Sequence, residues 1–163
     1  MNPRVVVVTQ QMVDEERVRQ MAPDGIELVI SSPADARWAD LMSQAEYLVG
    51  FVDMLVKPEL YRIAPRLRLI QLLSAGYDRA DIAAARKAGV PLANNGGANA
   101  VAVSEHALMF MLALSRKLLG QHANVVAGRW RGPSTPRLHE LRGQTLGIVG
   151  MGTIGKKTAR LAQ

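Results

Sequence analysis

Short apolar runs that alternate with helix-forming stretches constrain the fold of this chain more than any other feature. Residues 5–8 are four consecutive valines, and a continuous β-branched run is typical of a strand covered on both faces. Further runs with strand character occur at residues 26–30, 47–49, 67–73 and 90–93. Strands that alternate with helices through short connections predict a parallel sheet with helices on both faces. We therefore expect an α/β, flavodoxin-like doubly wound domain over residues 1–99.

Helices are predicted between these strands, at residues 14–21, 34–42, 58–63 and 78–88. Ser32 and Pro33 have the residue types of an N-cap and a first helical position, so they predict the start of the second helix. Gly89 predicts the end of the fourth helix, because glycine adopts the left-handed conformation of a C-cap at little cost.

A long helix is predicted over residues 100–120, after the loop of residues 94–99. Residues 107–114 are apolar on every side of this helix, which predicts that it is buried all round, between two domains or two subunits. Helical spacing resumes at residues 122–130, and a Gly- and Pro-rich breaker cluster occupies residues 132–136. We expect residues 100–143 to connect two domains and to form the interface of a homodimer.

Residues 150–155 read G-x-G-x-x-G. The apolar run at residues 146–149 before them predicts a buried strand, and residues 156–162 after them predict a helix. This context is the one that a dinucleotide-binding fingerprint requires. Gly150 would allow a tight turn, Gly152 would let the backbone approach a pyrophosphate, and Gly155 would let the helix pack closely on the strand. Residues 144–163 are therefore expected to begin a dinucleotide-binding domain, although an ordinary strand–helix turn has the same pattern.

The loop at residues 74–78 follows the fourth predicted strand, at the edge of the sheet where such folds bind ligands. A positive φ at Gly76 would turn consecutive N–H groups toward one point and bind a carboxylate. The alternative is a simple turn in which Asp78 caps the next helix. Asn99 fits either an N-cap or a ligand-binding amide, and Phe51 fits either a pocket wall or the core.

Three histidines are the candidate acid–base groups: His106, His122 and His139. None of them lies in a loop at the carboxyl end of a predicted strand, and no pair has metal-ligand spacing. The net charge of +6 raises the possibility of nucleic-acid binding, but the cations are scattered and only seven residues are aromatic. Without cysteines, a signal peptide or a transmembrane run, the sequence predicts a cytoplasmic protein with neither membrane nor nucleic-acid partners.

Taken together, these motifs resemble the D-isomer-specific 2-hydroxyacid dehydrogenases. The similarity rests on residues 72–78, 94–99, 103–107, 114–116, 128–130 and 141–155. The resemblance implies a hydride transfer between NAD or NADP and C2 of a small D-2-hydroxy or 2-keto acid. It also implies a split substrate domain, an inserted nucleotide domain and long helices that form a dimer.

Site residues follow from the same resemblance. Ala75 and Gly76 match the loop whose N–H groups hold the substrate carboxylate, Asn99 matches a substrate-side asparagine, and Phe51 lies near the pocket wall. The positions that match cofactor contacts are Val103 at the nicotinamide end and Gly150, Gly152, Thr153, Ile154 and Gly155 at the pyrophosphate.

The family's catalytic arginine, glutamate and histidine all follow the glycine fingerprint, as does the acidic residue that distinguishes NAD from NADP. These residues have no counterpart before Gln163. We therefore expect the chain to be part of a longer protein and to be inactive by itself. A non-catalytic, nucleotide-sensing regulator on the same scaffold is the alternative.

Overall fold

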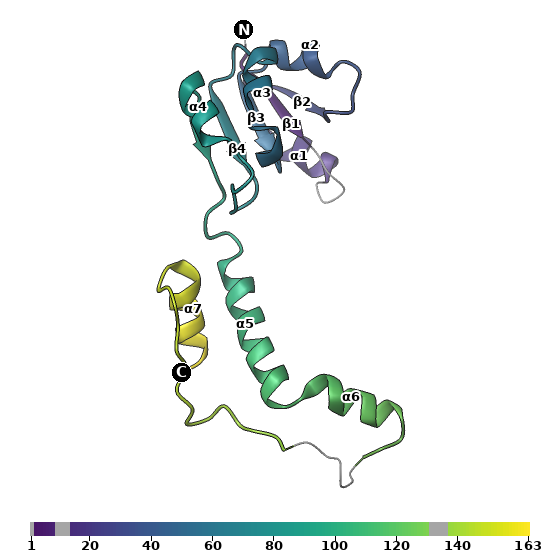
Figure 1. Cartoon of the computed structure of the whole chain (residues 1–163). Helices are drawn as coiled ribbons and strands as arrows, with labels where there is room; N and C mark the ends of the chain where they lie inside the picture. Colours follow the sequence, from purple (N-terminus) through teal and green to yellow (C-terminus); the bar gives the residue numbers. More distant parts are fainter. Residues whose placement is uncertain (1, 9–13, 131–136) are drawn as a thin grey trace. The chain divides into compact units, whose positions relative to one another are not determined.

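The computed structural model describes residues 2–8, 14–130 and 137–163. These residues form two compact units, Met1–Gly96 and Gly97–Gln163, and each unit is described by itself (Figure 1). The boundary falls inside the predicted loop at residues 94–99. The predicted breaker cluster at residues 132–136 lies outside the described residues.

A sheet of five parallel strands in the order β2-β1-β3-β4-β5 forms the centre of the first unit. Its strands are β1 (Arg4–Val8), β2 (Glu27–Ser31), β3 (Tyr47–Gly50), β4 (Leu69–Leu72) and β5 (Leu92–Ala93). Leu48 of β3 lies between Val6 of β1 and Ile70 of β4, and all three side chains are completely buried. The predicted α/β class and the order of a flavodoxin-like fold are confirmed.

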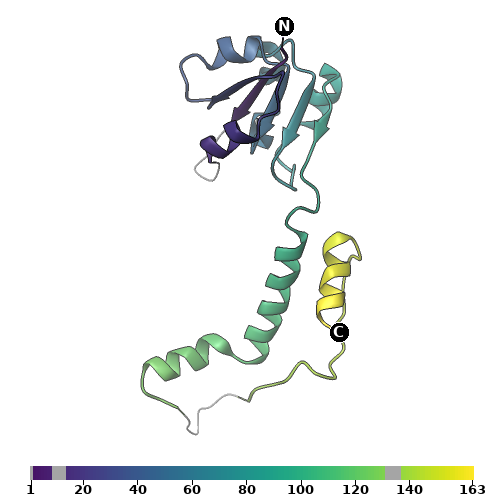
Figure 2. The same cartoon turned by 180° about the vertical axis from the view of Figure 1, so that it is seen from behind.

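The helices of this unit cover both faces of the sheet. They are α1 (Glu15–Met21), α2 (Trp38–Ser43), α3 (Pro58–Ile63) and α4 (Ile82–Ala88), with a 3-10 turn, η1 (Asp53–Leu55), before α3. Right-handed crossovers in this strand order place α1 on one face and the other three helices on the opposite face. Accordingly, α3 lies in front of the sheet in Figure 1 and α1 lies in front in Figure 2.

The main core fills the space between the sheet and helices α2, α3 and α4. Met42 of α2, Leu60 of α3 and Ala85 of α4 pack there with Leu48 and Ile70 of the sheet. Burial of a large apolar side chain contributes roughly 1.5–3 kcal/mol. This core therefore fixes the strands rigidly, and the loops at their carboxyl ends begin from fixed positions.

The observed helix ends match the predicted ones at some positions and differ from them at others. Asp14 caps α1 by accepting a hydrogen bond from the N–H of Arg17, and Gly89 ends α4 with a φ of 71°. The start of α4 is Ile82 rather than residue 78, because the Asp81 carboxylate accepts a hydrogen bond from the Ala84 N–H at 2.8 Å. The alternative in which Asp78 caps this helix is therefore wrong.

The helix predicted over residues 34–42 is present only from residue 38, so its predicted start with Ser32 as the cap is wrong. Helix α2 begins only at Trp38, and Asp35 is the reason. Its carboxylate accepts a hydrogen bond from the backbone N–H of Arg37 at 2.8 Å and pairs with the Arg37 guanidinium. Hydrogen bonds from Asp35 N–H to Ser32 C=O and from Trp38 N–H to Asp35 C=O form turns instead of a helix.

In the second unit, the expected long helix is two helices. They are α5 (Ala100–Ser115) and α6 (Leu118–Val126). Lys117, between them, has a left-handed backbone conformation with a φ of 50°. A continuous helix would need the carbonyl of Ser115 to accept a hydrogen bond from Leu119. That carbonyl instead accepts one from the N–H of His139 at 3.1 Å.

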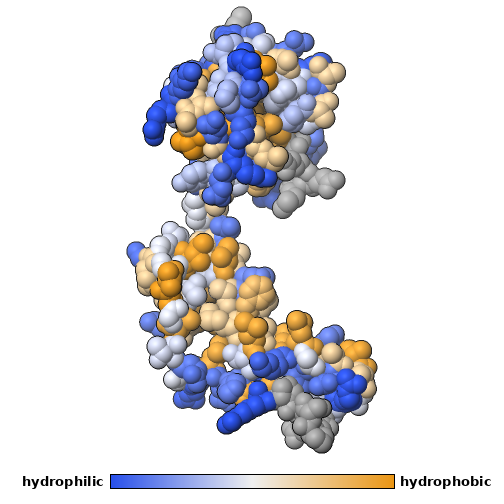
Figure 3. Space-filling view, in the orientation of Figure 1, coloured by the Kyte–Doolittle hydropathy of each residue, from blue (hydrophilic) through white to orange (hydrophobic). Residues whose placement is uncertain are grey.

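Helix α5 is not buried all round in the single chain, and its burial between two domains or two subunits stays a prediction. Small residues on one face pack against α7 (Thr153–Leu161), where Ala100, Ser104 and Thr158 are buried. On the other faces large apolar side chains are exposed, and Leu114 is 73% exposed. Hydrophobic side chains accordingly gather on the surface of this unit (Figure 3).

The buried strand predicted at residues 146–149 is not formed. The segment has no strand assignment, and Val149 is fully exposed. A strand needs a neighbouring strand to complete its hydrogen bonds, and no strand in the described part of the second unit offers one. The following helix is confirmed and begins three residues earlier than expected, at Thr153 rather than residue 156.

Candidate functional site

The loop after β4 is anchored at one end to the last residue of β3 and at the other end to the segment that follows β3. The N–H of Leu73 donates a hydrogen bond to the Gly50 carbonyl at 2.9 Å, and the N–H of Asp81 donates one to the Val56 carbonyl at 2.9 Å. Because β3 and β4 are neighbouring parallel strands, both segments lie at the carboxyl edge of the sheet. This is the edge at which open α/β sheets bind ligands.

Within this loop, the carbonyl groups are occupied. The Ser74 hydroxyl donates to the Gly76 carbonyl at 2.8 Å, and the Asn94 side-chain amide donates to the Ala75 carbonyl at 2.7 Å. The N–H of Asn95 donates to the Ser74 carbonyl at 2.9 Å. Asn94 and Asn95 come directly after β5, so the loop is held from this side too.

The N–H groups of the same loop are free for a ligand. Among the described residues, none accepts a hydrogen bond from the N–H of Ala75 or Gly76. A loop with satisfied carbonyls and unpaired N–H groups is suited to an anion. Gly76 does not have the positive φ that was predicted to create this arrangement. The hydrogen bonds of Ser74 and Asn94 orient the peptide groups instead, so that part of the prediction is wrong.

Phe51 and Gly76 line one cavity of about 320 Å³ in the first unit. Its other lining residues are Asp53, Ser74, Asp78 and Arg79. Phe51 enters it from the end of β3 and Gly76 from the loop after β4. The structure thus brings together two residues that the sequence proposed separately.

An ion pair between two residues that line this cavity could not be found from the sequence. Arg79 donates to Asp53 through Nε at 2.9 Å and through Nη2 at 3.0 Å. The Asp53 side chain is only 8% exposed, whereas that of Arg79 is 64% exposed. The hydrogen bond to Asp53 and the charge of its carboxylate raise the pKa of the Arg79 guanidinium. The residues lie 26 positions apart, and no local pattern links them.

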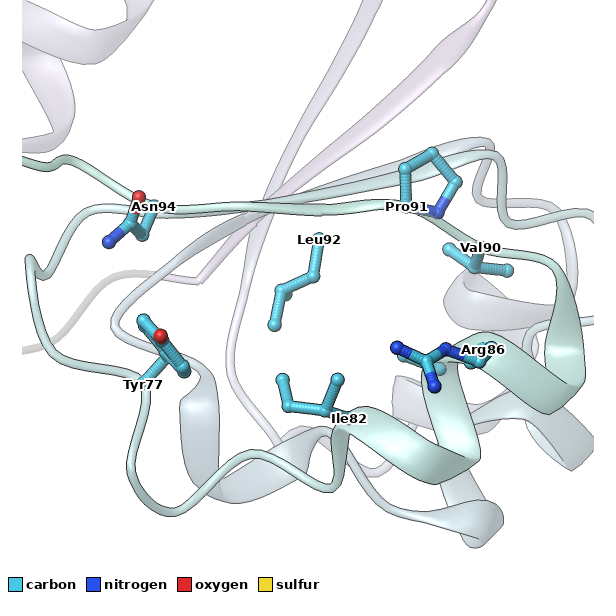
Figure 4. A pocket seen from close by; sticks show the side chains of 8 residues that line it. Tyr77, Ile82, Arg86, Val90, Pro91, Leu92 and Asn94 are labelled. Carbon is cyan, nitrogen blue, oxygen red and sulfur yellow. The ribbon is translucent and has the colours of Figure 1, made fainter.

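A second cavity of the first unit, about 280 Å³, lies between β5 and α4 (Figure 4). Leu92 and Ile82 face each other across it, and Arg86 lies at one side. Tyr77 and Asn94 line the opposite side. Tyr77 therefore belongs to this apolar cavity, whereas its neighbour Gly76 lines the other one.

The glycine fingerprint of the second unit has the backbone geometry that its spacing implies. Gly150 has a φ of 94°, and Gly152 is the N-cap of α7. A side chain at Gly155 would collide with the carbonyl oxygen of Gly150, whereas nothing lies within 4 Å of a side chain at Gly152. Gly155 is thus required for packing, and Gly152 leaves open space above the backbone.

Thr153 and Ile154 form the first turn of α7. The first N–H groups of a helix have no partner inside the helix, and the Lys156 N–H donates a hydrogen bond to the Gly152 carbonyl at 3.0 Å. Such an end attracts phosphate through its free N–H groups and the helix dipole. The residues present fit the pyrophosphate of a dinucleotide.

Asn99 and Val103 lie at the start of α5, in the same unit as the fingerprint. Asn99 occupies the N-cap position, but its side chain makes no capping hydrogen bond, so its amide is not used for that purpose. Val103 is on the first turn and is 37% exposed. Close to them, a side chain at Gly97 would lie 3.6 Å from the Thr153 methyl group, so the start of α5 and the fingerprint are near neighbours.

The three histidines, His106, His122 and His139, all lie in the second unit. His106 packs edge-on against Phe110, with ring centroids 4.3 Å apart, and His122 lies on α6. No group of three or more His, Cys, Asp and Glu side chains within the described ranges is arranged to hold a metal ion. The helices of the described residues are too short or too polar to cross a membrane.

Comparison with known proteins identifies the family. The family model described as D-isomer specific 2-hydroxyacid dehydrogenase, catalytic domain, matches residues 5–159. A glyoxylate reductase from Thermococcus litoralis is 30% identical over an alignment of 162 positions that covers 89% of this chain and 49% of the reductase.

Solved structures agree with this match. A D-lactate dehydrogenase from Treponema pallidum superposes with a TM-score of 0.76 at 28% identity, covering 98% of this chain and 50% of that one. The NAD-dependent formate dehydrogenase from Staphylococcus aureus in complex with NAD has the same fold, with a TM-score of 0.72 at 24% identity over 97% of this chain and 52% of that one. The chain spans about half the length of each of these relatives. It belongs to the D-isomer-specific 2-hydroxyacid dehydrogenase family.

Proposed function

We propose that this chain binds a small D-2-hydroxy or 2-keto acid and the phosphates of NAD or NADP, and that its parent activity is hydride transfer between them. The single observation that carries the proposal is the loop of Ala75 and Gly76. It presents unpaired N–H groups to a ligand at the carboxyl edge of the sheet.

In this proposal each unit has its own task. In the first unit, Ala75 and Gly76 donate hydrogen bonds to the substrate carboxylate, and Phe51 limits the cavity beside them. In the second unit, Gly150, Gly152 and the first turn of α7 hold the pyrophosphate. The positions Asn99 and Val103 match residues that contact the substrate and the nicotinamide in the family.

The cofactor would supply the hydride acceptor or donor, and this chain's residues would orient the two reactants. A general acid–base group and a carbonyl-polarising cation are still required. His106, His122 and His139 do not match the family's catalytic histidine, because they all precede the glycine fingerprint at residues 150–155. The 163 residues by themselves are therefore expected to bind and not to turn over.

We also propose a homodimer formed through α5. Leu114 and its apolar neighbours are exposed in the single chain, and water contact with such a surface is unfavourable. Residues 1–99, 100–143 and 144–163 would then be the substrate domain, the dimer segment and the beginning of the nucleotide domain. The cytoplasmic location stays a prediction from the sequence.

Oxidation of NADH and NADPH by a panel of 2-keto acids, followed at 340 nm with the parent protein rather than with these 163 residues alone, tests this function. Turnover of at least one keto acid is expected. Binding of the cofactor without turnover of any acid would instead identify a nucleotide-sensing regulator. Failure to bind either cofactor or acid would refute both.

A further inference from the structure

We propose that Arg79 determines which acid the site prefers. It would select 2-hydroxy and 2-keto acids that carry a second anionic group, a carboxylate or a phosphate, over neutral analogues of the same size. The inference rests on the proposed function, because the first carboxylate would be held by the N–H groups of Ala75 and Gly76.

The Arg79 guanidinium is held in place by Asp53. Both of its hydrogen bonds go to the buried Asp53 carboxylate, at 2.9 and 3.0 Å. Movement of the guanidinium away would leave a carboxylate unpaired in a site where it is 8% exposed, and an unpaired buried charge is strongly unfavourable. A flexible surface arginine loses conformational freedom when it binds an anion, whereas Arg79 has lost that freedom already.

Arg79 also retains N–H donors that Asp53 does not use. A guanidinium has five N–H donors in a fixed planar arrangement, and Asp53 uses Nε and one hydrogen of Nη2. The remaining donors of Nη1 and Nη2 form another edge, which has the geometry for two parallel bonds to a carboxylate or phosphate. No described residue accepts a hydrogen bond from this edge.

Arg79 is also in a suitable position to contact a bound acid. Arg79 and Gly76 line the same cavity of about 320 Å³, so an acid bound at the Gly76 N–H can direct its substituent toward Arg79. Asp78 lines this cavity as well and forms no ion pair with Arg79 in the described structure. Its negative charge repels any anion there. An acid whose second anionic group reaches Arg79 offsets this repulsion by pairing with the guanidinium.

Two ligands that differ at one group test the inference. D-malate and D-2-hydroxybutyrate share C1 to C3 and differ by a carboxylate or a methyl group at C4. Their dissociation constants are measured from the shift of the Gly76 amide signal in NMR spectra of the full chain. We expect D-malate to bind about fivefold more tightly, as one charge-assisted hydrogen-bonded pair in a partly solvated site implies, and the Arg79 Nε signal to move with it.

Arg79→Gln should abolish this preference, whereas the matched control Arg86→Gln should retain it. Arg86 lies on α4, lines the other cavity and changes the net charge equally. If Arg79→Gln does not fold, the double variant Asp53→Asn/Arg79→Gln replaces it, with the same loss expected. D-3-phosphoglycerate distinguishes the two anions, since tighter binding than that of D-malate would favour a phosphate.

Equal affinity for the two acids in the unaltered chain, or a preference that survives Arg79→Gln, would overturn the inference and leave the proposed function intact. If neither acid moves the Gly76 amide signal, the proposed function itself fails. The two failures are therefore distinguishable.

Discussion

Substitution of Gly155 by alanine should weaken both the second unit and its cofactor binding. A Cβ at Gly155 would overlap the carbonyl oxygen of Gly150 and lie 3.2 Å from its carbonyl carbon. The obstacle is backbone, so the turn itself must move, and overpacking of this kind costs about 1–3 kcal/mol. Alanine gains up to about 1 kcal/mol over glycine inside a helix. The net loss of stability is therefore expected to be about 1–2 kcal/mol.

Two nearby glycines provide matched controls. A Cβ at Gly152 or at Gly147 would meet no other atom within 4 Å, so alanine at either should leave stability within about 0.5 kcal/mol. Gly152→Ala should still lower cofactor affinity by about tenfold, because the methyl group occupies the space through which a pyrophosphate approaches the backbone. Gly147→Ala should change neither property.

Hydrogen exchange of α7 measures the stability of the second unit, and the fluorescence of NADH measures its binding. The expected pattern is loss of both for Gly155→Ala, loss of binding alone for Gly152→Ala, and no loss for Gly147→Ala. Normal protection of α7 and normal NADH affinity in Gly155→Ala would show that the described turn is not the cofactor site.

Three further predictions concern other parts of the chain. Gly76→Ala should lower acid affinity about tenfold, because a methyl group beside the free N–H obstructs the ligand, whereas stability should change by less than about 0.5 kcal/mol, since the Cβ meets only Asp78 Oδ2 at 3.4 Å. Calorimetric titration and thermal unfolding measure these two properties, and unchanged acid affinity would contradict the prediction. Lys117→Gly should raise the free energy of unfolding by about 0.5–1 kcal/mol, because glycine adopts a φ of 50° without strain. A lower free energy of unfolding for this variant, measured by denaturant titration, would show that Lys117 is not strained. Burial, and then the charge of Asp81, raise the pKa of Tyr61 above its usual 10.0. The stability that the protonated phenol contributes should therefore be complete below pH 10 and be lost as pH rises through the folded pKa. The free energy of unfolding measured against pH tests this, and an equal alkaline decrease in Tyr61→Phe would refute the assignment to Tyr61.

Local patterns in the sequence predicted most of the first unit. The valines of β1 form a strand because β-branched residues fit a sheet covered on both faces, and Asp14 and Gly89 act at helix ends through contacts within a few residues. Features that depend on distant residues were missed. The break after α5 depends on a hydrogen bond from His139 to Ser115, and the Asp53–Arg79 pair joins two loops.

For the candidate site, the sequence pointed to residues that the structure brings together, but not to the contacts that shape the loop. Phe51 and Gly76 do share a cavity, but the free N–H groups of the loop depend on Asn94 and Ser74 rather than on an unusual backbone angle at Gly76. The expected strand at residues 146–149 failed for a related reason, since a strand is completed by a partner elsewhere in the chain.

The central claim is that the N–H groups of Ala75 and Gly76 hold the carboxylate of a small 2-hydroxy acid. Titration of the ¹⁵N-labelled chain with glycolate tests it directly, because this ligand has the carboxylate and hydroxyl and no other substituent. If these N–H groups bind the carboxylate, the Ala75 and Gly76 amide signals should show saturable shifts, while the amide signals of α1 on the opposite face of the sheet do not move. Unchanged signals for both loop residues, or equal shifts throughout the first unit, would contradict it.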